Sequence, residues 1–198
     1  VGDPALPDDA ILENEPAPAG MGDAAALAAF DASLEGRSAR LVDWGARAPQ
    51  VVADAVRGVL GRADLTDADA LALALDPAKN PYRLETLNVS THAPLMRTLD
   101  HAYYTFRKKL SHSADSQDQR HRMVAGSRPL LSRNVPAAVD VIEPALIRDD
   151  PACHALFTEA VEAAWDARAR LIEMGASPQQ ALYLLPNAKA LRLVESGS

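Results

Sequence analysis

The sequence has one cysteine, few aromatic residues and a shortage of positive charge. Cys153 is the only cysteine, so the chain cannot form an internal disulfide, and we expect a reducing, cytoplasmic location. An aromatic fraction of 5% disfavours a large aromatic-lined barrel and favours closely packed, alanine-rich helices. The formal net charge of -7 argues against binding of nucleic acid through a broad positively charged surface. A local arginine cluster that binds a small anionic ligand stays compatible with this charge.

Long hydrophobic runs and metal-site spacings are also missing. No apolar run is long enough to span a bilayer and no signal peptide is visible, so we expect no membrane association. The five histidines and Cys153 do not show the spacing of a metal site, so we expect no metal. The first residue is Val1, and Ser198 follows a strand-like run directly. We interpret the chain as a fragment of a longer polypeptide or one trimmed at both ends.

Proline and glycine mark the first domain boundary. Residues 1–36 begin with a stretch rich in both residue types, which predicts a flexible N-terminal arm or linker, with a short alanine-rich helix at about 23–34. Residues 37–198 are long enough to form one ordinary domain with a hydrophobic core.

The domain is predicted to mix helices and strands. Periodicity and end signals predict helices from Pro49, over 64–75, within 111–122, over 151–174 and from Ser177. Strands are predicted over 39–44, 102–106 and 190–194. Because these elements do not alternate strictly as strand and helix, the pattern favours a mixed α/β (α+β) fold.

The densest polar cluster is Gln117–Arg122, which reads Q-D-Q-R-H-R. Two guanidiniums beside an imidazole are suited to phosphate, pyrophosphate or the edge of a flavin. Four further basic residues nearby would strengthen a local positive field: Lys108, Lys109, Arg128 and Arg133. In a chain with surplus acid such arginines often form surface ion pairs, so the cluster alone leaves both interpretations open.

Four segments, taken in sequence order, favour the ligand-binding interpretation over surface ion pairs. Leu41–Arg57 forms a strand–helix start, and Asp100–Phe106 places an acid–histidine pair ahead of an aromatic strand. Ser111–Arg122 ends in Arg-His-Arg, and Gly175–Ala188 ends in Leu-Pro-Asn-Ala. Together these segments resemble the flavin-dependent thymidylate synthase family over about residues 40–198.

The resemblance implies a twisted, mainly antiparallel sheet flanked by helices, in a homotetramer that holds FAD where subunits meet. It implies an enzyme that makes dTMP from dUMP, with methylenetetrahydrofolate as one-carbon donor and NADPH as reductant. The flavin supplies the difficult chemistry, so no cysteine nucleophile is required.

By the same resemblance, one group of residues binds the cofactor and another binds the pyrimidine nucleotide, while no catalytic residue is assigned. The cofactor group is Arg120, His121 and Arg122. The nucleotide group is Gln117, Ser132 and Arg133, the last two through a shifted loop.

Several family positions are altered. The family carries a glutamate after Arg-His-Arg, whereas Met123–Arg133 has none, and Arg128 occupies its approximate place. Leu182 replaces an arginine that binds nucleotide, which is not a conservative change. The family's late helix, with the residue thought to polarise the pyrimidine, would begin near Ser198, so we expect the domain to lack its C-terminal segment.

Three hypotheses follow from the sequence. The first is an FAD-dependent methylating enzyme of this family, as a divergent member or one half of a tandem protein, or a relative that acts on a different pyrimidine nucleotide. The second is a non-catalytic domain of the same fold that serves assembly or ligand sensing. The third is an unrelated α-rich interaction module whose arginines form surface ion pairs.

Overall fold

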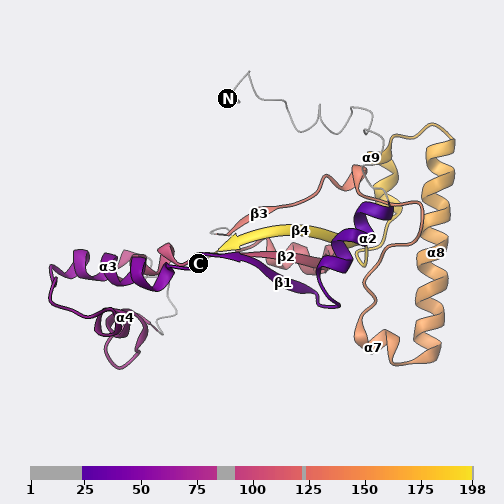
Figure 1. Ribbon diagram of the computed structural model, residues 1–198. Helices are drawn as coiled ribbons and strands as arrows, with labels where there is room; N and C mark the ends of the chain where they lie inside the picture. Colours follow the sequence, from indigo (N-terminus) through magenta and orange to yellow (C-terminus); the bar gives the residue numbers. More distant parts are fainter. Residues whose placement is uncertain (1–23, 84–91, 122–123, 198) are drawn as a thin grey trace, which may run out of the picture. The chain divides into compact units, whose positions relative to one another are not determined.

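A four-stranded antiparallel sheet flanked by helices forms the fold, in the strand order β1-β2-β4-β3 (Figure 1). The structure is a computed structural model that describes residues 24–83, 92–121 and 124–197. The strands are β1 (Ala39–Trp44), β2 (Tyr104–Ser111), β3 (Ala125–Ser127) and β4 (Ala190–Gly197). The predicted mixed α/β fold with a mainly antiparallel sheet is confirmed.

Helices of very different lengths surround the sheet. The α-helices are α2 (Ala24–Ser33), α3 (Ala48–Leu60), α4 (Asp67–Leu75), α5 (Pro94–Arg97), α6 (His112–Asp118), α7 (Ala145–Arg148), α8 (Pro151–Glu173) and α9 (Pro178–Ala181). The 3-10 helices are η2 (Thr98–His101), η3 (Leu131–Arg133) and η4 (Leu182–Leu184).

The helix starts follow the capping signals in the sequence. The Thr66 hydroxyl accepts a hydrogen bond from the backbone N–H of Asp69 at 3.1 Å and caps α4. The Asp150 carboxylate caps α8, with Pro151 in the first turn, and Ser177 opens α9 with a capping box. These interactions fix where each helix begins.

The described residues divide into two units, each with its own set of contacts. Unit 1 comprises 24–40, 107–121 and 126–194. Unit 2 comprises 41–83, 92–106, 124–125 and 195–197.

Unit 2 has a small core built largely from alanine and valine. Five buried residues of α3 and α4 form it: Val52, Ala53, Val56, Ala70 and Ala74. Small side chains let the two helices approach closely, and Leu95, Leu99 and Ala102 pack against the same cluster. None of the predicted site residues lies in this unit.

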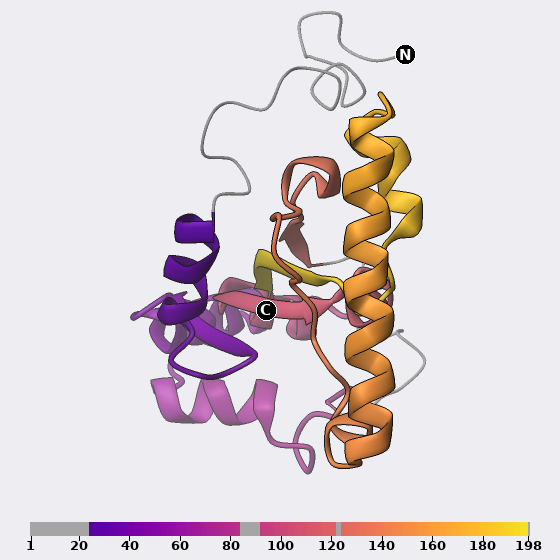
Figure 2. The ribbon, with the colours of Figure 1, turned by 90° about the vertical axis from the view of Figure 1, so that its right-hand side faces the viewer.

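The long helix α8 lies along one side of unit 1, beside α7 at its start and beside α9 and η4 at its end (Figures 1 and 2). Val161 and Trp165 are its buried residues. The Trp165 indole N–H donates to the Pro136 carbonyl at 3.2 Å. This bond ties α8 to the segment that follows η3.

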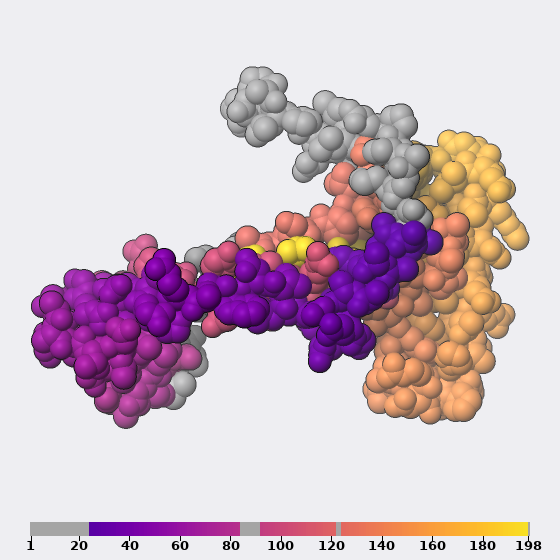
Figure 3. Space-filling model, in the orientation of Figure 1, coloured from indigo at the N-terminus to yellow at the C-terminus, as the bar shows by residue number. Residues whose placement is uncertain are grey.

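The central strand β4 is the most buried strand. Ala190, Leu191, Leu193 and Glu195 are each less than 5% exposed, and little of β4 reaches the face shown in Figure 3. Among the described residues, no helix is long and apolar enough to cross a membrane.

The predicted N-terminal arm is described only from residue 24. Residues 24–33 form α2, and the Asp31 carboxylate accepts hydrogen bonds from Arg192 and Lys109 of unit 1. The boundary at residues 36 and 37 stays a prediction.

Candidate functional site

The predicted cofactor residues directly follow α6. The backbone N–H groups of Arg120 and His121 donate to the carbonyls of Gln117 and Asp118, both at 3.1 Å, and so form a turn. The side chains of Gln117, Arg120 and His121 are exposed. Arg122 lies outside the described residues.

The side chains of Arg120 and His121 are available to a ligand. Within the part of the chain that the structure describes, neither makes a hydrogen bond or an ion pair with another residue. Arg120 therefore does not form the surface ion pair that the alternative hypothesis expects of it.

Partly buried ion pairs hold α6 in place. Asp115 is 6% exposed and accepts from Arg128 Nε at 2.9 and 3.2 Å. Lys108 Nζ lies 3.2 Å from both oxygens of Asp118. The Arg128 side chain lies directly over Gly126, where a Cβ atom would collide with it. Arg128 therefore has a structural role, although the sequence places it near a family ligand position.

The positive field predicted around the triplet is largely neutralised. Besides the two pairs of α6, Lys109 Nζ donates to Asp31 at 2.7 Å. These three lysine and arginine side chains have carboxylate partners, whereas the Arg120 side chain has none among the described residues.

The predicted nucleotide residues lie on two different elements. Gln117 belongs to α6, whereas Ser132 and Arg133 lie on η3, which contacts α9. The Ser132 hydroxyl is buried and has no hydrogen-bond partner among the described residues. The side chains of Ser132 and Arg133 are half-buried.

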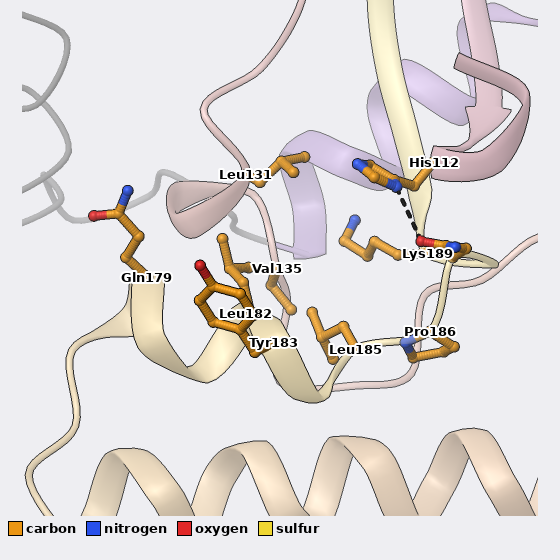
Figure 4. A pocket seen from close by; sticks show the side chains of 10 residues that line it. His112, Leu131, Val135, Gln179, Leu182, Tyr183, Leu185, Pro186 and Lys189 are labelled. Atoms are coloured by element: carbon orange, nitrogen blue, oxygen red, sulfur yellow. Dashed lines mark hydrogen bonds between the residues drawn. The ribbon is translucent and has the colours of Figure 1, made fainter. Parts of the chain in front are cut away.

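A pocket of about 420 Å³ lies in unit 1 (Figure 4). It is lined by His112, Leu131, Val135, Gln179, Leu182, Tyr183, Leu185, Pro186, Asn187 and Lys189. None of the predicted site residues that the structure describes lines this pocket. Sequence reasoning assigned no binding role to the pocket, although its wall includes Leu182, the altered family position, and Leu185–Asn187 of the Leu-Pro-Asn-Ala motif.

One end of the pocket is polar. His112 Nδ1 lies 3.2 Å from Asn187 Oδ1, and since an amide oxygen only accepts, His112 donates through Nδ1. The backbone N–H groups of His112 and Ser113 donate to the carbonyls of Lys189 and Asn187 at 2.8 and 3.0 Å. The start of α6 is thus fixed against the segment that leads into β4.

Lys189 lies at this polar end and is 5% exposed. Its Nζ donates to Asp140 Oδ2 at 3.2 Å and to the Ala190 carbonyl. Val141 forms an antiparallel bridge with Lys189, and the Ala190 N–H donates to the Asp140 carbonyl at 2.9 Å. This backbone pairing places the Asp140 carboxylate beside Lys189.

Arg192 joins the carboxylates of Asp31 and Asp140. Its guanidinium donates to both oxygens of Asp31, each at 2.7 Å, and to both oxygens of Asp140, at 2.8 and 3.0 Å. The Arg192 side chain is 8% exposed. With Lys189 and Lys109 these residues form a network of five charged groups, which we call the Arg192 network; Arg192, Asp140 and Lys189 are largely buried in it, whereas Asp31 and Lys109 are half-buried.

The Arg192 network shifts the pKa values of its carboxylates. Burial alone would raise the pKa of Asp140, but the Arg192 hydrogen bonds and the charges of Lys189 and Arg192 outweigh it, so the pKa is lowered from 3.8. Burial likewise opposes the lowering at Asp31, where Arg192 and Lys109 lower the pKa. Both carboxyls are therefore stabilised as carboxylates in the folded protein.

We expect the free energy of unfolding to fall as the pH drops through about 4, because both aspartates bind protons more readily in the unfolded chain. An Asp140→Asn variant should show a smaller loss of stability between about pH 5 and pH 2. Urea unfolding at a series of pH values measures this slope. Asp166→Asn on the exposed side of α8 is the control, and equal slopes for Asp140→Asn and the wild type would contradict the prediction.

The described residues show neither a cluster of metal ligands nor a buried thiol. They contain no group of three or more His, Cys, Asp or Glu side chains that could hold a metal ion. Cys153 is exposed near the start of α8.

The sequence and fold of the chain are similar to those of known proteins. The model of the thymidylate synthase complementing protein family (Thy1) matches residues 40–198. The chain belongs to this family, which confirms the resemblance seen in the sequence. Membership makes it a methyltransferase of the thymidylate-synthase-like kind.

Solved structures with a similar fold include PolB, a UMP/dUMP methylase from Streptomyces cacaoi. PolB bound with 5-Br UMP has 17% identity and a TM-score of 0.57, with 81% of this chain and 71% of PolB covered. PolB bound with 5-Br dUMP has 19% identity and a TM-score of 0.59, with 80% and 72% covered. At this identity the likeness is one of fold. A comparison with curated protein sequences finds no significant match.

Proposed function

We propose that the protein methylates a pyrimidine nucleotide of the dUMP type in an FAD-dependent reaction. Methylenetetrahydrofolate is the proposed one-carbon donor and NADPH the reductant. The observation that carries the proposal is the pair of exposed donors, Arg120 and His121, left without partners among the described residues, in a chain of this family. The fold shared with a UMP/dUMP methylase supports the choice of a pyrimidine nucleotide.

The donor chemistry of the triplet fits a flavin nucleotide. A guanidinium offers a charged, forked set of donors to pyrophosphate or carbonyl oxygens, and an imidazole adds a further donor. Arg120, His121 and Arg122 are the residues that would hold FAD. When bound, the flavin supplies the reducing chemistry of the methyl transfer, and the residues of the chain bind and orient.

The nucleotide is proposed to contact Gln117, Ser132 and Arg133. The buried Ser132 hydroxyl, which has no partner in the described part of the chain, offers a hydrogen bond to it. None of these residues that the structure describes lines the pocket of unit 1. A cytoplasmic homotetramer, in which copies complete each other's sites, is part of the proposal.

An Arg120→Ala variant should bind FAD at least about tenfold more weakly, because one charge-assisted contact is lost. The visible absorption spectrum, recorded after addition of FAD and removal of the excess, measures retention. Arg170→Ala on the exposed side of α8 is the matched control and should retain flavin like the wild type. Unchanged flavin affinity in Arg120→Ala would show that the triplet is not the cofactor site.

A non-catalytic, ligand-sensing domain is the second candidate, and Leu182 favours it. This leucine stands in the pocket wall where the family resemblance places a nucleotide-binding arginine. Oxidation of reduced flavin by methylenetetrahydrofolate, dependent on dUMP or UMP, would support the enzyme. Flavin retention without any nucleotide-dependent oxidation would support the sensing domain.

A further inference from the structure

The helix that precedes the proposed cofactor residues is short and has no apolar anchor. α6 has seven residues, and helices shorter than about 12 residues are marginal in water without tertiary contacts. Backbone hydrogen bonds from His112 and Ser113 fix its start. The buried residue of α6 is a carboxylate, Asp115, and not a hydrophobic side chain. Beyond its first turn, α6 therefore depends on polar partners for its position.

Arg128 is the partner of this buried carboxylate. Its Nε donates to both oxygens of Asp115, at 2.9 and 3.2 Å, and its Nη2 lies 3.8 Å from Asp118 Oδ2 near the end of the helix. The Asp115 side chain is 8% exposed. A buried carboxylate that loses its cation is strongly unfavourable, whereas a surface carboxylate is not. Without Arg128, Asp115 should therefore move toward solvent and displace α6.

Backbone hydrogen bonds extend this anchoring to the cofactor residues. The Asp115 carbonyl accepts from the N–H of Gln119 at 2.9 Å, and the Asp118 carbonyl accepts from the N–H of His121 at 3.1 Å. The turn that presents the proposed cofactor residues is thus built directly on the two aspartates that Arg128 contacts. A shift of these aspartates must shift the turn.

Gly126 leaves the space that the Arg128 guanidinium occupies. A Cβ atom at position 126 would collide with Nη1 of Arg128 and lie 3.2 Å from its Cζ, and the nearest atoms to that Cβ all belong to Arg128. A side chain at position 126 must therefore push the guanidinium away from Asp115, although it removes no charge. Gly126 thus provides a second, independent way to break the same contact.

We infer that Arg128 is a positioning residue for the cofactor. Through Asp115 it fixes α6 and the turn after it, and so holds Arg120 and His121 in place for the flavin. Gly126 is required for this arrangement. The inference rests on the proposed function, because it takes Arg120 and His121 as flavin contacts, whereas the link from Arg128 to the turn rests on the described hydrogen bonds alone.

Amide hydrogen exchange on the full chain tests the link to the turn without any ligand. In Arg128→Ala the N–H groups of Gln119 and His121 should exchange at least about tenfold faster than in the wild type, because their acceptors are no longer fixed. The amides of α8 should change much less. Unchanged exchange in the turn, or an equal increase in α8, would overturn the inference, since the latter reports overall stability alone.

Flavin fluorescence titration, well below the melting temperature of each variant, tests the consequence for FAD. Arg128→Ala and Gly126→Ala should each weaken FAD binding by about tenfold or more, because contacts misplaced by about 1 Å lose much of their effect. Gly58→Ala is the matched control, at an exposed glycine with no atom within 4 Å of the added Cβ. Val56→Ala lowers stability through the core of unit 2 and should also retain FAD affinity.

A double variant shows whether the two residues act through one contact. In the Arg128→Ala background, Gly126→Ala should not weaken FAD binding further, because the guanidinium that it would displace is already absent. Additive effects of the two changes on FAD affinity would overturn the assigned role of Gly126. If Arg128→Ala does not fold, Gly126→Ala decides, since it retains every charge of the contact.

Arg120→Ala separates failure of this inference from failure of the proposed function. Weak FAD binding in Arg120→Ala, with wild-type binding in Arg128→Ala and Gly126→Ala, would overturn the positioning role alone. Unchanged FAD affinity in all three variants would overturn the proposed cofactor site, and with it the cofactor role of Arg128, even where the turn exchanges faster.

Discussion

Replacing Arg192 with methionine is expected to lower the free energy of unfolding by about 3 to 5 kcal/mol. The guanidinium is the only group that joins Asp31 to Asp140 in the Arg192 network, and its side chain is 8% exposed. Its removal leaves the largely buried Asp140 with Lys189 alone and the half-buried Asp31 with Lys109 alone. Methionine retains much of the apolar volume of the arginine side chain, so the decrease in the free energy of unfolding reflects mainly the missing charge.

Urea unfolding followed by circular dichroism measures this effect. Arg62→Met is the matched control, because Arg62 pairs with Asp64 at the surface, where both side chains are more than half exposed. Such a surface pair contributes about 0 to 1 kcal/mol to the free energy of unfolding. A loss in Arg192→Met no larger than that in Arg62→Met would show that the network does not stabilise the fold.

Trp165→Ala is expected to be similarly damaging, with a loss of about 3 to 5 kcal/mol and a melting temperature lower by roughly 10 °C. Trp165 is 4% exposed, so its removal leaves a large cavity under α8. It also removes the hydrogen bond to the Pro136 carbonyl. Thermal unfolding followed at 222 nm measures the shift.

The second tryptophan provides the comparison. Trp44 is 56% exposed at the end of β1, and Trp44→Ala should cost less than about 1 kcal/mol. Trp165→Phe should fall between the two, since it keeps most of the ring volume and loses the indole donor. Equal melting temperatures for the two alanine variants would mean that α8 is not held by Trp165.

Local elements were largely predictable because their signals lie within a few residues. Thr66, Asp150 and Ser177 cap helices by bonding to backbone groups two or three positions away. Alternation predicted β1 and β4, and the family motifs pointed to the sheet that joins them. The exposed end of α6 was likewise visible as the polar run that ends in Arg120 and His121.

The pocket and the Arg192 network could not be predicted in the same way. Asp31 and Arg192 are separated by 161 positions, and nothing near either residue indicates its partner. Lys189 reads as an ordinary polar residue ahead of a strand, although it is buried and lines the pocket. The sequence also suggested a positive field around Lys108 and Arg128, because their carboxylate partners become neighbours only once α6 has folded.

The Arg192 network also sets the order in which the chain can fold during synthesis. The core of unit 2 joins residues of neighbouring helices, such as Val56 and Ala70, so it can form early from local contacts. Arg192, the main partner of the Asp31 carboxylate, follows it by 161 positions in the chain. The pair can therefore form only after residue 192 has left the ribosome. The Asp31–Arg192 pair of unit 1 therefore forms later in synthesis than the contacts between α3 and α4 in unit 2.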